Sequence, residues 1–242
     1  MRRPRALLLG PLIVCALAIA GAALAGKGDK AKRAATGTVT GKVVFDGEPP
    51  ARAKLVRDSD PVCARTDKLG EEVVVTDGRL RDVLVRLPNG SAGSQPAPTE
   101  PVVVTQRECM YTPRVVGVVT GQQLVIRNAD ATYHNIRAAS GKKTVFNLSQ
   151  PASAPEITRD NLGKAGEVIA LHCDVHGWMQ AFAVVNDHPH FAVTGEDGAF
   201  TLAGVPAGTY QLEAWHPTLG QQTVEVTVKA GKTASATFRF PG

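Results

Sequence analysis

The segment "GEVIALHCDVHGWMQAFAVVN", residues 166–186, contains two apolar runs separated by a short polar loop. The runs "GEVIALHC" and "MQAFAVVN" are rich in β-branched residues, which is the pattern of two strands joined by a loop. The loop holds Cys173, His176 and Met179 with the spacing C-x2-H-x2-M. Such a loop is short enough to direct all three side chains at one point once a metal ion is present.

The strand pattern extends over most of the chain. Runs such as "GTVTGKVVF", "EPVVVTQ" and "QQLVIRN" alternate with clusters of Gly, Pro, Asn and Asp, and almost no segment reads as helix. From Phe191 onward, apolar and polar residues alternate between the turns "GEDG", "GVPAG", "HPTLG" and "KAGK", as a small sandwich requires. We therefore expect an all-β protein with two sandwiches.

The first 25 residues are typical of an export signal. Three arginines precede an apolar run, and the small-residue pattern at Ala23–Ala25 offers a cleavage site. Two alternatives remain open, which are an uncleaved membrane anchor and a lipoprotein signal ending at Cys15. We expect the protein to be exported to the periplasm or the cell exterior, and to be tethered there if the segment is retained.

The net charge of +5 does not indicate a nucleic-acid partner. The signal supplies +3, and "KGDKAKR" supplies a further +3 from four basic residues and Asp29, so the rest of the chain carries about −1. A nearly neutral folded part lacks the basic face that nucleic-acid binding requires.

The cysteine count predicts one disulfide. Loss of the signal removes Cys15 and leaves Cys63, Cys109 and Cys173. In an oxidising compartment two of the three should pair. Because Cys173 lies among possible metal ligands, we expect the disulfide to join Cys63 to Cys109.

The ligand types in the 173–179 loop favour copper. Thiolate and thioether suit Cu(I), imidazole accepts both copper oxidation states, and two His with one Cys and a weak axial Met form the blue-copper arrangement. Zinc seldom recruits a thioether, so Met179 discriminates between the two metals. The candidate for the missing ligand is His134 in "RNADATYHNIRA", which follows the strand "GQQLVIRN". The other histidines read as surface or structural residues.

Residues from about Pro101 to Asn186 resemble the cupredoxins (plastocyanin, azurin and pseudoazurin), with the ligand-loop spacing of amicyanin. The resemblance implies one type 1 copper ion bound by His134, Cys173, His176 and Met179. It places Asn135 where hydrogen bonds tie the two ligand-bearing loops together. It also implies that one ring edge of the loop histidine faces solvent, within an apolar patch that Trp178 and Val175 supply. Val175 and Gly177 stand where many members have proline, which leaves the loop less braced.

The last fifty residues resemble the carboxypeptidase regulatory-like (transthyretin-like) β-sandwich, through "TGEDGAFTLAGVPAGTYQLEAWHPTLG". The segment from Thr36 to Asn89 has no counterpart in a minimal cupredoxin, and we expect it to add strands to the copper-binding core, held by the Cys63–Cys109 disulfide. The predicted divisions are a signal at 1–25, a linker at 26–36, a cupredoxin-like domain at 37–187 (extension 37–95, core 96–187) and a regulatory-like sandwich at 190–242.

These features predict a one-electron carrier that docks transiently with a redox protein such as a cytochrome or a dehydrogenase. We do not expect an enzyme, because Cys173 and His176 lack the third orienting group of a nucleophilic site and no further histidine cluster offers more copper sites. No small-molecule substrate is evident. The alternative is a non-redox structural, adhesion or copper-storage protein on the same scaffold.

Overall fold

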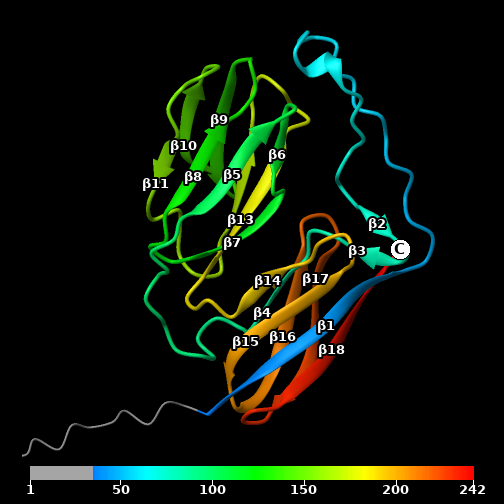
Figure 1. The fold of residues 1–242 in the computed structure, drawn as a ribbon, viewed down its shortest axis with the longest axis vertical. Coiled ribbons are helices and arrows are strands. Elements are labelled where there is room, and N and C mark those ends of the chain that lie inside the picture. Colours follow the sequence, from blue (N-terminus) through cyan, green and yellow to red (C-terminus); the bar gives the residue numbers. More distant parts are fainter. Residues whose placement is uncertain (1–34) are drawn as a thin grey trace, which may run out of the picture. The chain divides into compact units, whose positions relative to one another are not determined.

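The computed structural model describes residues 35–242 (Figure 1). The predicted signal and most of the predicted linker lie outside the described residues. The described part is all-β, as expected, and its single helical element is the short 3-10 helix η1 (Cys63–Arg65). No helix within residues 35–242 is long and apolar enough to cross a membrane.

The first sandwich packs a five-stranded sheet against a four-stranded sheet. The five-stranded sheet has the order β10 (Lys143–Gln150), β9 (His134–Ser140), β12 (Val168–His172), β13 (Gln180–Asn186) and β7 (Val115–Val119). The four-stranded sheet has the order β11 (Ile157–Arg159), β8 (Leu124–Asn128), β5 (Val102–Arg107) and β6 (Met110–Thr112). Alternate apolar residues of both sheets, such as Val104, Ile126 and Ile169, form one buried core, as strand alternation requires.

The second sandwich uses strands from both ends of the described chain. One sheet has the order β15 (Ala199–Pro206), β1 (Thr36–Asp46), β3 (Arg79–Leu80) and β2 (Val75–Thr76), with β18 (Thr233–Pro241) paired to β1. The other has the order β14 (Phe191–Val193), β4 (Leu84–Arg86), β16 (Gly208–His216) and β17 (Gly220–Val228). A separate apolar core, which includes Val43, Leu202 and Phe238, fills this sandwich.

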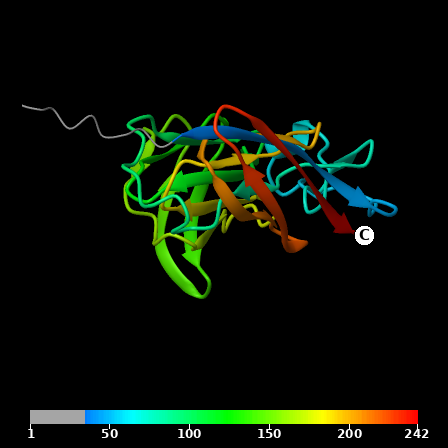
Figure 2. The same cartoon turned by 90° about the horizontal axis from the view of Figure 1, so that it is seen from below.

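The placement of β1 differs from the sequence-based prediction. β1 pairs in parallel with β18, from Thr38 opposite Thr233 to Asp46 opposite Pro241, and antiparallel with β15 (Figures 1 and 2). Its buried residues Val39, Val43 and Phe45 belong to the core of the second sandwich. Residues 36–46 therefore complete the C-terminal sandwich and do not add a strand to the 96–187 core, because β1 pairs with β15 and β18 and buries its apolar face in the second core.

The two sandwiches meet at β7, whose five residues are all buried. Val116 and Val118 face the first core, while Val115 packs with Leu84 of β4 and Val184 of β13. Gly117 lies between Val116 and Val118 in the sequence, and a Cβ atom on it would lie 2.3 Å from the ring of Phe191. The absence of a side chain at Gly117 therefore allows β14 to approach β7 closely.

The segment between β1 and β2 is irregular and is tied to the first sandwich. Cys63 forms a disulfide with Cys109, in the turn between β5 and β6, with 5.6 Å between the Cα atoms. The predicted disulfide is thus confirmed. We call residues 52–68 the cap segment, and η1 lies within it. Cys63 and Cys109 are both fully buried in the core of the first sandwich, so the disulfide fixes the cap segment to that core.

Candidate metal centre

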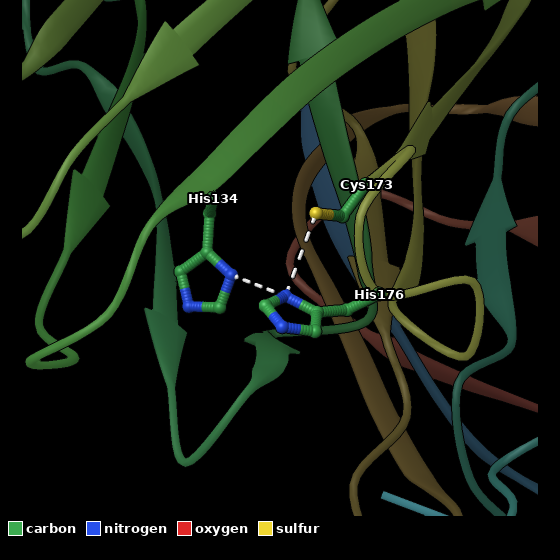
Figure 3. Close-up of side chains that lie close together, drawn as sticks. All are labelled: His134, Cys173 and His176. Carbon is green, nitrogen blue, oxygen red and sulfur yellow. Dashed lines mark hydrogen bonds between the residues drawn. The ribbon is translucent and has the colours of Figure 1, made fainter. Parts of the chain in front are cut away.

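Three of the predicted ligands meet at one end of the first sandwich. His134 begins β9, Cys173 directly follows β12, and His176 lies in the loop between β12 and β13. The pairing of β9 with β12 brings the two ligand-bearing segments to the same sheet end. The side chains of all three residues point toward one another (Figure 3), and their ligand atoms all lie within 4.8 Å of one another.

The distances define a compact, buried triad. Nδ1 of His134 lies 2.9 Å from Nδ1 of His176, and Sγ of Cys173 lies 3.8 Å from Nδ1 of His176. All three residues are buried. Two unprotonated Nδ1 atoms at this separation repel each other, so a proton or a cation must lie between them. The donor set therefore suits a metal ion that takes the place of that proton.

The 173–179 loop is closed by its own backbone. Met179 N–H donates to the carbonyl of His176 at 2.9 Å, and Cys173 N–H donates to the carbonyl of Met179 at 3.3 Å. The Met179 side chain is fully buried and packs in the same core cluster as Cys173. Its role as the fourth ligand stays a prediction.

Asn135 links the two ligand-bearing segments. Its Oδ1 accepts hydrogen bonds from Asp174 N–H at 2.7 Å and from the Cys173 thiol at 3.4 Å. Its Nδ2 donates to the Asp174 carboxylate and to Asn147 Oδ1, both at 2.9 Å. His134 directly precedes Asn135 in β9, so these bonds fix the position of Cys173 relative to His134.

A carboxylate contacts the outer nitrogen of each histidine, which the sequence reasoning missed. Asp130 Oδ2 lies 2.9 Å from His134 Nε2, and Asp60 Oδ2 lies 3.1 Å from His176 Nε2. A carboxylate accepts the Nε2 proton and so leaves the Nδ1 lone pair free for a metal. Asp130 stands four residues before His134, and this spacing is a local signal. The sequence contains no comparable signal for Asp60.

The electrostatics of the triad favour a cation. Burial raises the pKa of the Cys173 thiol, but hydrogen bonding with His134 and the nearby backbone outweighs it, and the pKa falls below the usual range. Burial lowers the pKa of His134, but hydrogen bonds with Asp130 and Cys173 raise it above the usual range. The pKa of His176 is lowered by burial and then by the charge of His134. The lowered pKa of Cys173 and the raised pKa of His134 both favour the charged forms of these two groups.

Asp60 is an anion at neutral pH. Burial raises its pKa, but hydrogen bonds from Thr132 and from the backbone of Val62 and Cys63 outweigh this effect and lower the pKa to about 2. A negative charge therefore lies directly behind the ring of His176.

The ring edge of the loop histidine is covered, contrary to the expectation of an exposed edge. His176 is 1% exposed, because Asp60 and Cys63 of the cap segment lie over it, with Cys63 Sγ 3.7 Å from His176 Nε2. Trp178 is only partly exposed, its ring centroid lies 5.1 Å from that of His176, and its Nε1–H donates to the carbonyl of Cys109 at 2.9 Å. Val175 is 52% exposed and remains at the surface. The cap segment has no place in a minimal cupredoxin, so the resemblance could not predict this cover.

A family model of the carboxypeptidase regulatory-like domain matches residues 180–241. No curated protein sequence matches the chain.

Among solved structures, amicyanin from Paracoccus versutus is 18% identical, with a TM-score of 0.32 over 42% of this chain and 98% of amicyanin. A purple cupredoxin from Nitrosopumilus maritimus is 16% identical, with a TM-score of 0.29 over 35% of this chain and 99% of that protein. A copper-containing nitrite reductase from Thermus scotoductus is 16% identical, with a TM-score of 0.31 over 43% of this chain and 25% of the reductase.

Proposed function

We propose that this protein is an exported one-electron carrier with a single type 1 copper ion, held by His134, Cys173, His176 and Met179. The observation that carries the proposal is the buried triad of two imidazoles and one thiol, with 2.9 Å between the two Nδ1 atoms and 3.8 Å between Sγ and Nδ1. The thiol and thioether favour copper over harder metals.

The triad has the size that one ion needs. A metal at about 2.0–2.1 Å from each imidazole nitrogen and about 2.3 Å from a thiolate can join two nitrogens up to about 4 Å apart and a nitrogen to a sulfur up to about 4.3 Å apart. The separations of 2.9 and 3.8 Å lie within both limits, and no separation in the triad exceeds 4.8 Å. The side chains therefore need little movement to share an ion.

The chain's own residues keep the site rigid and dry. Bound copper would supply the one-electron change between Cu(I) and Cu(II). Asn135 holds Cys173 and Asp174 in place, and the backbone bonds of Met179 hold the loop closed. Rearrangement between oxidation states is then small, which favours fast electron exchange.

A carrier role fits the closure of the site better than catalysis. His134, Cys173 and His176 are at most 2% exposed, so a small molecule has no open approach to the ligand atoms. An electron can cross a few ångströms of protein, whereas a substrate cannot. Val175 and Tyr133, the neighbours of two ligands in sequence, are exposed and offer an apolar surface for transient contact with a redox protein.

The test is copper loading followed by absorption spectroscopy. The Cu(II) protein should show an intense thiolate-to-copper band toward the red end of the visible spectrum, and this band should bleach on reduction. Cys173→Ser should abolish the band, while His172→Asn, at the preceding position, should retain it. A wild-type protein that binds one copper ion and stays colourless would refute the proposal.

Copper storage is the second candidate, and the cover over His176 is the observation that favours it. A store needs a site that retains its ion, and Asp60 with Cys63 closes this one. Stopped-flow mixing of the reduced protein with an oxidised c-type cytochrome separates the two roles. A carrier should transfer its electron within milliseconds to seconds, whereas a store should keep Cu(I) under the same conditions.

A further inference from the structure

The cap segment places a fully bonded carboxylate against the candidate metal site. Asp60 Oδ2 accepts a hydrogen bond from Thr132 Oγ1 at 2.6 Å and lies 3.1 Å from His176 Nε2. Its Oδ1 accepts from the backbone N–H of Val62 at 2.7 Å and of Cys63 at 3.3 Å. Residues other than His176 thus orient both oxygens. The carboxylate is therefore preorganised to accept a hydrogen bond from Nε2–H of the histidine.

The disulfide fixes this arrangement from the other side. Cys63 is three residues after Asp60 and is bonded to Cys109. Cys109 N–H donates to Asp130 Oδ2 at 2.9 Å, the same oxygen that lies 2.9 Å from His134 Nε2. One covalent bond therefore joins the turn that contains Asp60, which contacts His176, to the β5–β6 turn. That turn binds Asp130, which contacts His134.

Arg57 adds a further anchor to the same cap segment. Its guanidinium donates to the carbonyls of Thr66 and Glu108, and it lies 5.8 Å from the ring centroid of Trp178. The cap segment is thus held to the β5–β6 turn by a charged side chain as well as by the disulfide. Asp60 has little freedom to leave His176.

We propose that Asp60 is a positioning residue for His176. Through this contact Asp60 makes the site bind Cu(II) more tightly relative to Cu(I). The inference rests on the proposed function, because it assigns Asp60 a role toward the same metal. Asp60 holds the ring in the tautomer that presents Nδ1 to the metal, and its charge makes the imidazole a stronger donor. A stronger donor next to a negative charge favours Cu(II) over Cu(I).

A purely structural role for Asp60 makes a different prediction. Its bonds to Val62 and Cys63 form a local turn, and loss of that turn alone would destabilise the cap segment without changing the metal preference. Asp60→Asn separates the two roles, because asparagine keeps the shape and one oxygen acceptor but removes the charge. Asp58→Asn is the matched control, since Asp58 is exposed, lies two residues away and carries the same charge.

The experiment measures Cu(II), Cu(I) and Zn(II) affinities of the full-length wild type and of both variants by chelator competition. We expect D60N to lower the affinities for Cu(II) and Zn(II) about tenfold or more, and the affinity for Cu(I) much less. A tenfold fall in the ratio of Cu(II) affinity to Cu(I) affinity raises the reduction potential by about 59 mV. D58N should leave all three affinities within twofold of wild type.

Thr132→Val is a second, milder variant in case D60N folds poorly. It removes the hydroxyl that orients Asp60 and leaves the charge in place, so it should shift the affinity ratio in the same direction by a smaller factor. The inference is overturned if D60N or T132V folds and matches the wild-type ratio, or if D58N shifts the ratio as much as D60N does.

The two proposals fail in distinguishable ways. A wild type with the thiolate-to-copper band and a D60N variant with unchanged affinities would refute the role of Asp60 alone. A wild type that lacks the band but binds Zn(II) about tenfold more tightly than D60N would refute the electron carrier and support the positioning role. A wild type that binds none of the three ions would overturn both.

Discussion

His216 ends β16 with its imidazole buried in the second sandwich, near the ring of Phe240. Its Nδ1 accepts hydrogen bonds from the backbone N–H of Thr218 and Leu219, both at 3.2 Å. Nε2 therefore carries the proton of the neutral ring, and it is buried without a hydrogen-bond partner. Burial and then the charge of Arg114 lower the pKa of His216 from 6.5 to about 4.

The first prediction concerns the pH dependence of stability. A lowered folded-state pKa contributes stability that is present above pH 6.5 and is lost as the pH falls toward and through about 4. A shift from 6.5 to about 4 is worth roughly 3 kcal/mol. Urea unfolding of the wild type at pH 7 and pH 4 should show this loss in excess of that in His216→Asn, whose amide oxygen can still accept a backbone hydrogen bond. Equal losses in both proteins would show that His216 is not the titrating group.

At the residue scale, local spacing predicted the candidate ligands but not the groups behind them. Cys173 and His176 share one short loop, and His134 follows a strand, so residue type and spacing were sufficient to select them. Asp60 lies 116 positions before His176. A single aspartate in a polar stretch such as "VRDSDPVC" has no pattern that distinguishes it from a solvated surface residue, so only the folded chain shows its contact.

At the element scale, the cap segment depends on the disulfide more than on secondary structure. Its regular structure is the short helix η1 and one isolated backbone bridge, from Lys54 to Leu69 just after the cap segment. Its side chains include the exposed Val56, and few apolar contacts hold it down. The Cys63–Cys109 bond, which spans 46 positions, therefore supplies much of its order.

The second prediction follows from that bond. Replacement of both cysteines by alanine should lower the free energy of unfolding by about 4 kcal/mol, mainly because the unfolded chain gains the entropy of an open loop of that length. Guanidinium unfolding measures the change. Trypsin should also cleave the variant faster after Arg65, which is exposed in the cap segment. A reducing agent should lower the free energy of unfolding of the wild type and leave that of the double variant unchanged. The opposite pattern would contradict the prediction.

Strands were easier to predict than their partners. Alternation in "GTVTGKVVF" indicates a strand with one buried face, which is what β1 has. Alternation contains no information about which sheet that face covers, because pairing depends on contacts between distant segments. This is why β1 was predicted to join the first sandwich when it lies between β15 and β18 of the second.

At the scale of the whole molecule, the first sandwich is an insertion in the second. β1, β3 and β4 come before residues 102–186, and β14 to β18 come after them, yet both groups form the same pair of sheets. The regulatory-like match at residues 180–241 therefore covers only part of the sandwich that the structure contains. The all-β class and the presence of two sandwiches could be predicted from the sequence, but their discontinuous division could not.

The third prediction tests this division. Deletion of residues 1–46 removes β1, which lies inside its sheet and buries Val39, Val43 and Phe45. We expect the second sandwich of the remaining chain to lose cooperative thermal unfolding, since β15 and β18 lose their shared partner. The matched control is deletion of residues 1–34 alone, which should leave the transition unchanged. Recovery of the transition on addition of a peptide of residues 35–46 would support the assignment, and a normal transition without the peptide would contradict it.

The parallel pairing of β1 with β18 also sets the order in which the protein can be completed. A ribosome makes β1 before the other strands that the structure describes, so β1 lacks its two long partners, β15 and β18, until residues 199–241 have emerged. The inserted sandwich, whose strands are all made in between, can close first. During biosynthesis the apolar face of β1 thus needs protection from aggregation until β15 and β18 are available to pair with it.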